Sequence, residues 1–339
     1  MHEEENMLPA GVQGCQKGGD VPKDAGGHEK AAGQPVWGKK CGRGRGAQAD
    51  AEISRDDDKP VGDAEWLAGV EKGLQKKFRK TIWCPFVQAI NRYELIRPGD
   101  RIAVCISGGK DSMLMAKLFQ ILKRHNKIPF EVCFLVMDPG YSKENRLRIE
   151  SNASRLAVPV EIFQSTIFES VFDIEKSPCY LCARMRRGHL YNRAKQLGCN
   201  KIALGHHYDD VIETILMGML YGAQIQTMMP KLHSTNFPGM ELIRPMYMVR
   251  EDDIKAWRDF YGLQFLQCAC KFTERNCARG TGDTNSKRLE IKELIRELKK
   301  KNQYVEGNIF ASVENVNLST VIAYKERGVR HNFLEWYDE

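Results

Sequence analysis

Apolar and polar positions follow two different periods along the middle of the chain. Short apolar runs predict strands at 101–106, 131–137, 159–163 and 201–205. Apolar residues that recur every three or four positions predict helices at 66–91, 112–124, 143–156, 184–197 and 286–301. Because strands and helices alternate, we predict an α/β fold, a doubly wound parallel sheet covered by helices on both faces. Ligands of such sheets bind at the carboxyl ends of the strands.

The composition divides the chain into four parts. Residues 1–65 contain few large apolar side chains, which predicts a disordered N-terminal tail. Residues 66–97 are expected to form a helical segment with a basic face, and residues 98–303 the main α/β domain. Residues 304–339 form a C-terminal extension to which the sequence assigns no role.

The net charge of +7 lies outside the first sixty residues, which hold nine basic and eleven acidic side chains. A basic folded part suits a polyanion such as RNA, although many basic domains bind none. The chain shows no apolar signal segment and no stretch long enough to cross a bilayer, so we expect a cytoplasmic protein without a membrane partner. In a reducing compartment, close cysteine pairs indicate metal or redox sites rather than disulfides.

A glycine-rich motif follows the first predicted strand and opens the next helix. Its residues are Ser107, Gly108, Gly109, Lys110, Asp111 and Ser112. The glycines let backbone N–H groups approach an anion, and Lys110 adds a full positive charge. Asp111 is suited to holding a magnesium ion. An ordinary strand-to-helix turn often contains two glycines, but it rarely contains Lys-Asp-Ser as well.

A second motif places Cys179 and Cys182 as a CxxC pair just ahead of a predicted helix. Helix starts and nearby arginines lower the pKa of thiols, which favours the thiolate needed for metal binding or sulfur transfer. Two cysteines are too few for a metal site, so the pair is either a redox pair or is completed by another cysteine. Cys268, Cys270 and Cys277 are the candidates.

The glycine-rich motif resembles the PP-loop of ATP pyrophosphatases, which split ATP into AMP and pyrophosphate. Together with the CxxC pair and a late cysteine, it is similar to the TtcA family of tRNA 2-thiocytidine synthetases. Three further segments also resemble that family: Gly205–Thr214, Ile243–Pro245 and Asn285–Arg288. The resemblance extends from Phe78 to Arg288 and identifies residues 98–303 as a PP-loop ATPase and thiolase domain.

The resemblance implies an enzyme that uses ATP and Mg²⁺ to adenylate the C2 carbonyl of cytidine 32 in the anticodon loop of tRNA. Sulfur would then replace the oxygen, delivered through a [4Fe-4S] cluster held by Cys179, Cys182 and Cys268, with Cys270 as the alternative third ligand. A cysteine desulfurase is the expected sulfur source, and a homodimer is compatible with the resemblance.

The resemblance also suggests residues outside the two motifs. Asp209 and Asp210 are candidates for catalysis, and Gly205 and Arg244 for nucleotide binding. Paired aspartates often merely cap a helix. His206 and His207 could donate to phosphate, although a histidine bonded to backbone is commoner. Four other cysteines lie in apolar runs and are expected in the core: Cys84, Cys105, Cys133 and Cys199.

Three alternatives share parts of this pattern. A thiolase that makes 2-thiouridine would share the cysteines, and a lysidine-forming amidating enzyme would share the loop without needing the CxxC pair. A non-enzymatic module with structural zinc would favour four closed ligands.

Overall fold

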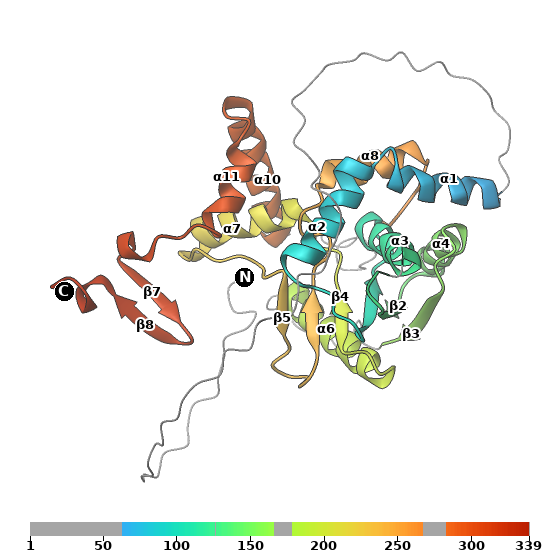
Figure 1. Cartoon of the computed structure of the whole chain (residues 1–339), viewed down its shortest axis with the longest axis horizontal. Helices are drawn as coiled ribbons and strands as arrows, with labels where there is room; N and C mark the ends of the chain where they lie inside the picture. Colours follow the sequence, from blue (N-terminus) through green and yellow to red (C-terminus); the bar gives the residue numbers. More distant parts are fainter. Residues whose placement is uncertain (1–62, 126, 166–177, 267–282, 339) are drawn as a thin grey trace, which may run out of the picture.

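The computed structural model describes residues 63–125, 127–165, 178–266 and 283–338, while the side chains of residues 178–183 and 283–286 lie outside that description. In this part of the chain, a six-stranded sheet has the order β3-β2-β1-β4-β6-β5 (Figure 1). Its strands are β1 (Arg101–Ile106), β2 (Glu131–Asp138), β3 (Val160–Gln164), β4 (Lys201–Ala203), β5 (Lys231–His233) and β6 (Glu241–Ile243). All neighbours run parallel except β5, which pairs antiparallel with β6 at the edge.

Nine α-helices are described around the sheet and toward the C-terminus. They are α1 (Asp63–Gln75), α2 (Cys84–Arg92), α3 (Lys110–His125), α4 (Lys143–Arg155), α6 (Pro178–Gln196), α7 (Tyr208–Gly222), α8 (Glu251–Phe260), α10 (Asp283–Lys301) and α11 (Val305–Ser312), with the π-helical turn η1 (Arg79–Trp83) between α1 and α2. The predicted strands and the predicted doubly wound α/β fold are confirmed. Within the described ranges, no helix is both long and apolar enough to cross a membrane.

The strand order creates a switch point between β1 and β4. The chain moves outward from β1 through β2 to β3, and then returns through α6 to β4 on the other side of β1. The loops that leave β1 and β4 therefore diverge at the carboxyl ends of these strands, which is where sheets of this kind bind ligands. The glycine-rich loop and the segment 204–207 both follow these strand ends.

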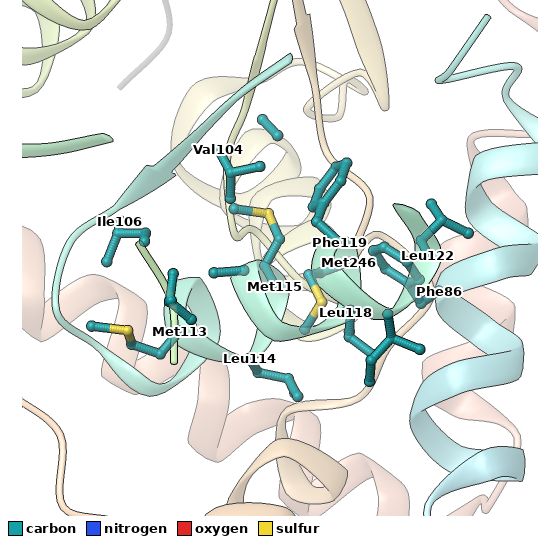
Figure 2. Packing of buried hydrophobic residues seen from close by; sticks show 14 of the residues in the cluster. Phe86, Val104, Ile106, Met113, Leu114, Met115, Leu118, Phe119, Leu122 and Met246 are labelled. Carbon is teal, nitrogen blue, oxygen red and sulfur yellow. The ribbon is translucent and has the colours of Figure 1, made fainter. Parts of the chain in front are cut away.

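Helix α3 is the centre of the larger core. Met113, Leu114, Leu118 and Phe119 are completely buried between the sheet and the outer helices (Figure 2). Phe119 meets Phe86 of α2 edge-on, with ring centroids 5.8 Å apart. Burying each such side chain contributes about 1.5–3 kcal/mol, so this packing fixes the position of the α3 N-terminus, where the glycine-rich loop ends.

Helix α6 covers the opposite face of the sheet. Its Tyr191 and Ala194 pack against strand residues in a second core, which also contains Cys105 and Cys199. The four cysteines expected in the core are free thiols, two of them buried and two half-buried. Their assignment to packing is confirmed.

The predicted helix at 66–91 is not continuous, which corrects that expectation. It consists of α1, the π-helical turn and α2. The amides of Phe78 and Trp83 each bond a carbonyl five residues back, which widens the turn and buries Ile82 and Trp83. Pro85 near the start of α2 suits a new helix start, because proline lacks the N–H that a continuous helix would need.

The C-terminal extension is packed onto the domain at its start. Phe310 of α11 stacks on Tyr208 of α7, with centroids 4.6 Å apart. Beyond α11, the short hairpin of β7 (Ala323–Glu326) and β8 (Val329–Asn332) forms a separate sheet (Figure 1).

We predict that Lys201→Ala lowers the free energy of unfolding by about 3–5 kcal/mol, because it leaves buried carboxylates without their counter-charge. The Lys201 ammonium lies 2.9 Å from both Asp100 and Glu241 and is itself buried. Urea unfolding measures the change. The control is Lys300→Ala, which removes an exposed pair with Glu297 and should cost under about 1 kcal/mol. Equal losses would contradict the interpretation.

Candidate active site

The glycine-rich loop is held in shape by its own serines. The backbone N–H of Ser107 donates to Oγ of Ser112 at 3.1 Å, and that hydroxyl donates to the carbonyl of Gly109 at 3.0 Å. The helix α3 starts at Lys110, so its positive end faces the loop. This arrangement of a tight turn before a helix start is suited to binding phosphate.

Three segments that are remote in sequence pack directly against this loop. Gly108 has φ +84°, and a Cβ there would lie 2.7 Å from Cγ1 of Ile149 and 3.0 Å from Cδ1 of Leu266. The amide of Leu266 donates to the carbonyl of Gly108 at 3.2 Å. A Cβ on Gly205 would lie 3.2 Å from the amide nitrogen of Ser112. Gly205, expected to bind nucleotide, is thus positioned where close backbone approach leaves no room for a side chain.

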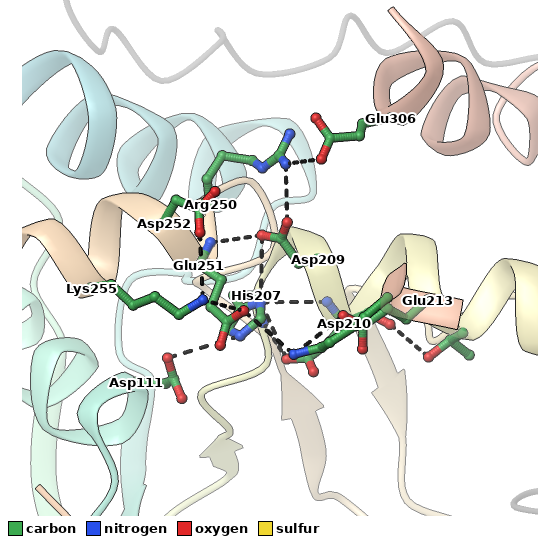
Figure 3. A network of polar contacts seen from close by, with 12 residues as sticks. Asp111, His207, Asp209, Asp210, Glu213, Arg250, Glu251, Asp252, Lys255 and Glu306 are labelled. Carbon is green, nitrogen blue, oxygen red and sulfur yellow. Dashed lines mark hydrogen bonds and ion pairs between the residues drawn. The ribbon is translucent and has the colours of Figure 1, made fainter. Parts of the chain in front are cut away.

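Asp111 lies in a network of charged groups at the carboxyl edge of the sheet (Figure 3). Lys110 joins this network through two ion pairs. The Lys110 ammonium is 3.1 Å from Asp111 and 3.2 Å from Glu251, the first residue of α8. Glu251 also contacts Lys255 at 3.0 Å and Lys292 at 3.4 Å. Burial opposes ionisation of this carboxyl, but Lys255, Lys110 and Lys292 lower the pKa of Glu251 to about 2.

Asp209 and Asp210 occupy the first turn of α7, close to the same network. His207 caps this helix, with Asp210 bonding back to the His207 amide at 3.0 Å. Asp209 accepts bonds from the amide of Glu251 at 2.7 Å and from Arg250 at 3.0 Å. Both aspartates therefore have the structural roles that the sequence left open, and the structure brings them together with Asp111.

Glu213 is the most perturbed acid of the network. It is buried on α7, 3.4 Å from Arg288 and 3.5 Å from Lys292 of α10. Burial raises the pKa of Glu213 to about 7, although Lys292 and Arg288 oppose the rise. Arg288 also lies 3.5 Å from Asp210, so α10 is joined to the site through charged contacts.

His206 and Arg244 lie deeper beside the network. Burial and the nearby Arg244 lower the pKa of His206 to about 4, so this imidazole is neutral at pH 7. Arg244 is buried after β6 and donates to the carbonyl of Met229. Neither residue joins the contacts of Lys110 and Asp111 that are described here.

The CxxC pair lies within the first turn of α6 rather than ahead of it, because this helix begins at Pro178. Cys179 and Cys182 are three positions apart near the start of this helix. Met185, one turn later, packs against Met137 near the carboxyl end of β2. The pair is thus attached to the edge of the sheet that carries the glycine-rich loop.

The predicted third ligand, Cys268, lies outside the described residues, as do Cys270 and Cys277. The last described residues before it, Leu263–Leu266, belong to no strand. Leu266 is nevertheless bonded to Gly108. Among the described residues, no group of three His, Cys, Asp or Glu side chains forms a metal site.

Sequence patterns missed several charged residues of this network. No sequence motif contains Glu251, Arg250 or Lys292. The fold brings Glu251 to Lys110, Arg250 to Asp209 and Lys292 to Glu251. The run of acidic residues in the first turn of α8 was the only signal that the sequence offered for them. Arg288 was noted only as part of a resemblance.

Comparison with known proteins agrees with the fold and the loop. The sequence matches the PP-loop domain family over residues 80–279. A solved structure, the U34-tRNA thiolase NcsA from Methanococcus maripaludis with its [4Fe-4S] cluster, superposes with a TM-score of 0.52 and 18% identity over 74% of this chain and 78% of that one. Fold and loop define a PP-loop ATP-binding α/β protein.

Curated relatives place the chain more narrowly. The tRNA-cytidine(32) 2-sulfurtransferase of Syntrophotalea carbinolica is 35% identical over 73% of this chain and 92% of the relative. That of Pelobacter propionicus is 32% identical over 68% of this chain and 83% of the relative. This chain belongs to the tRNA-cytidine(32) 2-sulfurtransferase family, as the resemblance predicted.

We predict that Gly108→Ala weakens ATP binding and lowers stability by about 1–3 kcal/mol, through strain at positive φ and the contact with Ile149. Gly99→Ala is the matched control, because Gly99 has φ +85° with nothing within 4 Å of a Cβ. Calorimetric titration with ATP and urea unfolding measure both quantities. Equal loss of ATP affinity in the two variants would show that the packing around Gly108 is irrelevant.

The raised pKa of Glu213 predicts a pH-dependent stability. Between its ordinary value of 4.5 and about 7 the folded state binds a proton that the unfolded state does not, so stability falls as the pH rises through this window. Glu213→Gln should remove that fall, and the difference between the two proteins should reach about 3 kcal/mol at most. Urea unfolding at pH 4.5, 6 and 8 tests this. If the free energies of unfolding of the two proteins changed with pH in parallel, the raised pKa of Glu213 would be contradicted.

Proposed function

We propose that this chain thiolates tRNA by adenylating the C2 carbonyl of cytidine 32 and replacing its oxygen with sulfur. Membership of the 2-sulfurtransferase family supports ATP-dependent tRNA thiolation as the activity. The observation that carries the proposal is that the phosphate loop, the start of α6 with its CxxC pair and the segment before Cys268 lie at one edge of the sheet.

The loop 107–112 binds the phosphates of ATP, with the α-phosphorus facing the incoming base. The carbonyl oxygen attacks this phosphorus, and pyrophosphate leaves. The Lys110 ammonium and the backbone amides at the start of α3 stabilise the charge that develops on the departing phosphates. The Lys110 ammonium is held between Asp111 and Glu251.

Asp111 is the proposed protein ligand of Mg²⁺. Its carboxylate stands beside Lys110 in the first turn of α3. Magnesium usually keeps several waters and takes one or two carboxylates together with substrate phosphates, so a preformed cage of three acids is not required. Asp209 and Asp210, at the start of the neighbouring α7, are paired with Arg250 and Arg288.

The chemistry of the donor set fits a cluster with three thiolate ligands, which Cys179, Cys182 and Cys268 would supply. Cys179 and Cys182 are three positions apart near the start of α6, and Leu266, two residues before Cys268 in the sequence, is bonded to Gly108. A [4Fe-4S] cluster held by these cysteines would supply the sulfur. The chain's own part is to hold the adenylated base beside these thiolates until AMP leaves.

The substrate and the sulfur supply follow from this chemistry. A base in a single-stranded loop can be extruded at low cost, which makes the anticodon loop accessible to a site at the sheet edge. We propose a cysteine desulfurase as the upstream sulfur source, the cytoplasm as the location and a homodimer as the assembly.

Anaerobic thiolation followed by nucleoside mass spectrometry tests the proposal. The chain with reconstituted iron and sulfide, tRNA and MgATP should form 2-thiocytidine. Cys179→Ser should abolish the product while retaining ATP binding, and Lys110→Ala should slow it by roughly 10²–10³-fold. Cys84→Ala is the control cysteine, far from the site and expected to retain activity.

Two outcomes would contradict specific parts of the proposal. Formation of 2-thiouridine in place of 2-thiocytidine would show that the assigned base is wrong while the thiolase remains. Stoichiometric zinc with no thiolated product would show that the chain is a metal-binding module instead.

A further inference from the structure

A groove outside the active site runs along the exposed side of α4. It has a volume of about 570 Å³ and lies between this helix and the turn Gly262–Gln264. Its lining is mostly polar and basic, with Arg148, Ser151 and Arg155 from α4 and a single acid, Glu144. An exposed leucine, Leu147, adds an apolar surface between the polar groups.

The segments that line this groove also pack against the phosphate loop. Asn152 on the inner side of α4 donates to the carbonyl of Gln264 at 2.8 Å. Two residues later, Leu266 donates to Gly108, and Ile149 packs against the same glycine. A ligand in the groove is therefore separated from the nucleotide loop by only one layer of side chains.

The basic surface continues from the groove toward the N-terminal helices. The Arg155 guanidinium stacks on Trp66 of α1, 4.1 Å from the ring centroid, and Trp66 meets Tyr261 edge-on. Next to Tyr261, Phe260 is half exposed and carries the ammonium of Lys77, 3.4 Å above its ring. The groove, the aromatic residues Trp66, Tyr261 and Phe260, and Lys77 thus form one connected strip on the surface.

The described part of the chain offers the cations of this strip no carboxylate partner. No carboxylate among the described residues lies within ion-pair distance of Arg148 or Arg155. The same holds for the exposed cations of the turn between α1 and α2, which are Lys76, Lys77, Arg79 and Lys80. This contrasts with the active-site lysines, each of which meets Glu251.

We infer that this strip binds the phosphate backbone of tRNA next to the nucleotide that enters the active site. The inference rests on the proposed function. A base that reaches the phosphate loop brings its flanking phosphates across the surface beside that loop, and unpaired arginines and lysines there release counterions when they bind phosphate. Leu147 and the Arg148 guanidinium also offer faces for an unstacked base.

The test measures the affinity of tRNA as a function of salt concentration for the full chain. Arg148→Gln/Arg155→Gln should weaken binding, and the slope of log K against log salt should fall in magnitude by about 1 for each lost phosphate contact. In thiolation assays KM for tRNA should rise, with kcat at saturating tRNA unchanged. Arg148→Gln alone, which breaks no described contact, should lower the slope by about 1.

Two controls separate this site from a general effect of charge. Lys325→Gln/Arg330→Gln removes the same charge from the exposed β7–β8 hairpin and should leave the slope unchanged. Arg148→Lys/Arg155→Lys should retain most of the slope. Thermal unfolding of each variant checks that the fold stays stable when the contact between the Arg155 guanidinium and Trp66 is lost.

An unchanged slope in Arg148→Gln/Arg155→Gln, or an equal fall in the hairpin control, would overturn the inference. An acidic protein or a membrane would then be the better partner for this strip. Failure of the proposed function looks different, because the unaltered chain would bind tRNA with the predicted salt dependence and yet form no thiolated nucleoside.

Discussion

The tight packing around the phosphate loop is the constraint on which the site depends. Gly108 and Gly205 leave no space for a side chain, so Ile149, Leu266 and the α3 backbone approach the loop directly. Close packing makes such positions intolerant of even one added carbon. The loop is therefore the point where α4, the end of β4 and the chain leading to Cys268 are held together, although they are remote in sequence.

Ion pairs connect the loop to the helices around it. Glu251 joins Lys110 to Lys292, and Lys292 also faces Glu213, so α8, α10 and α7 meet around one lysine. Buried charges are costly unless they are paired, which limits the ways in which these helices can be arranged. In the described ranges, no carboxylate pairs with Arg148 and Arg155 of α4 or with the cations of the turn between α1 and α2. The molecule thus has a neutralised catalytic edge beside an exposed basic surface.

Much of this arrangement was predictable because it is local. The strands at 101–106 and 131–137 and the helix at 112–124 have clear apolar periods, and the loop between them has an unusual composition. The three-residue strands β5 and β6 are too short to show a period. The π-helical turn replaces a helix that the pattern predicts as continuous, since its cause is tertiary packing. Glu251 could not be predicted because its contact with Lys110 arises only when α8 docks on α3.

The central claim is that one base can contact both the nucleotide and the thiolates. A crystal structure of the reconstituted chain, grown without oxygen and with a non-hydrolysable ATP analogue, measures this most directly. The account predicts phosphates on residues 107–112 and a cluster on Cys179, Cys182 and Cys268, with both facing one cavity. A cluster on another edge of the sheet, or phosphates away from Lys110, would contradict it.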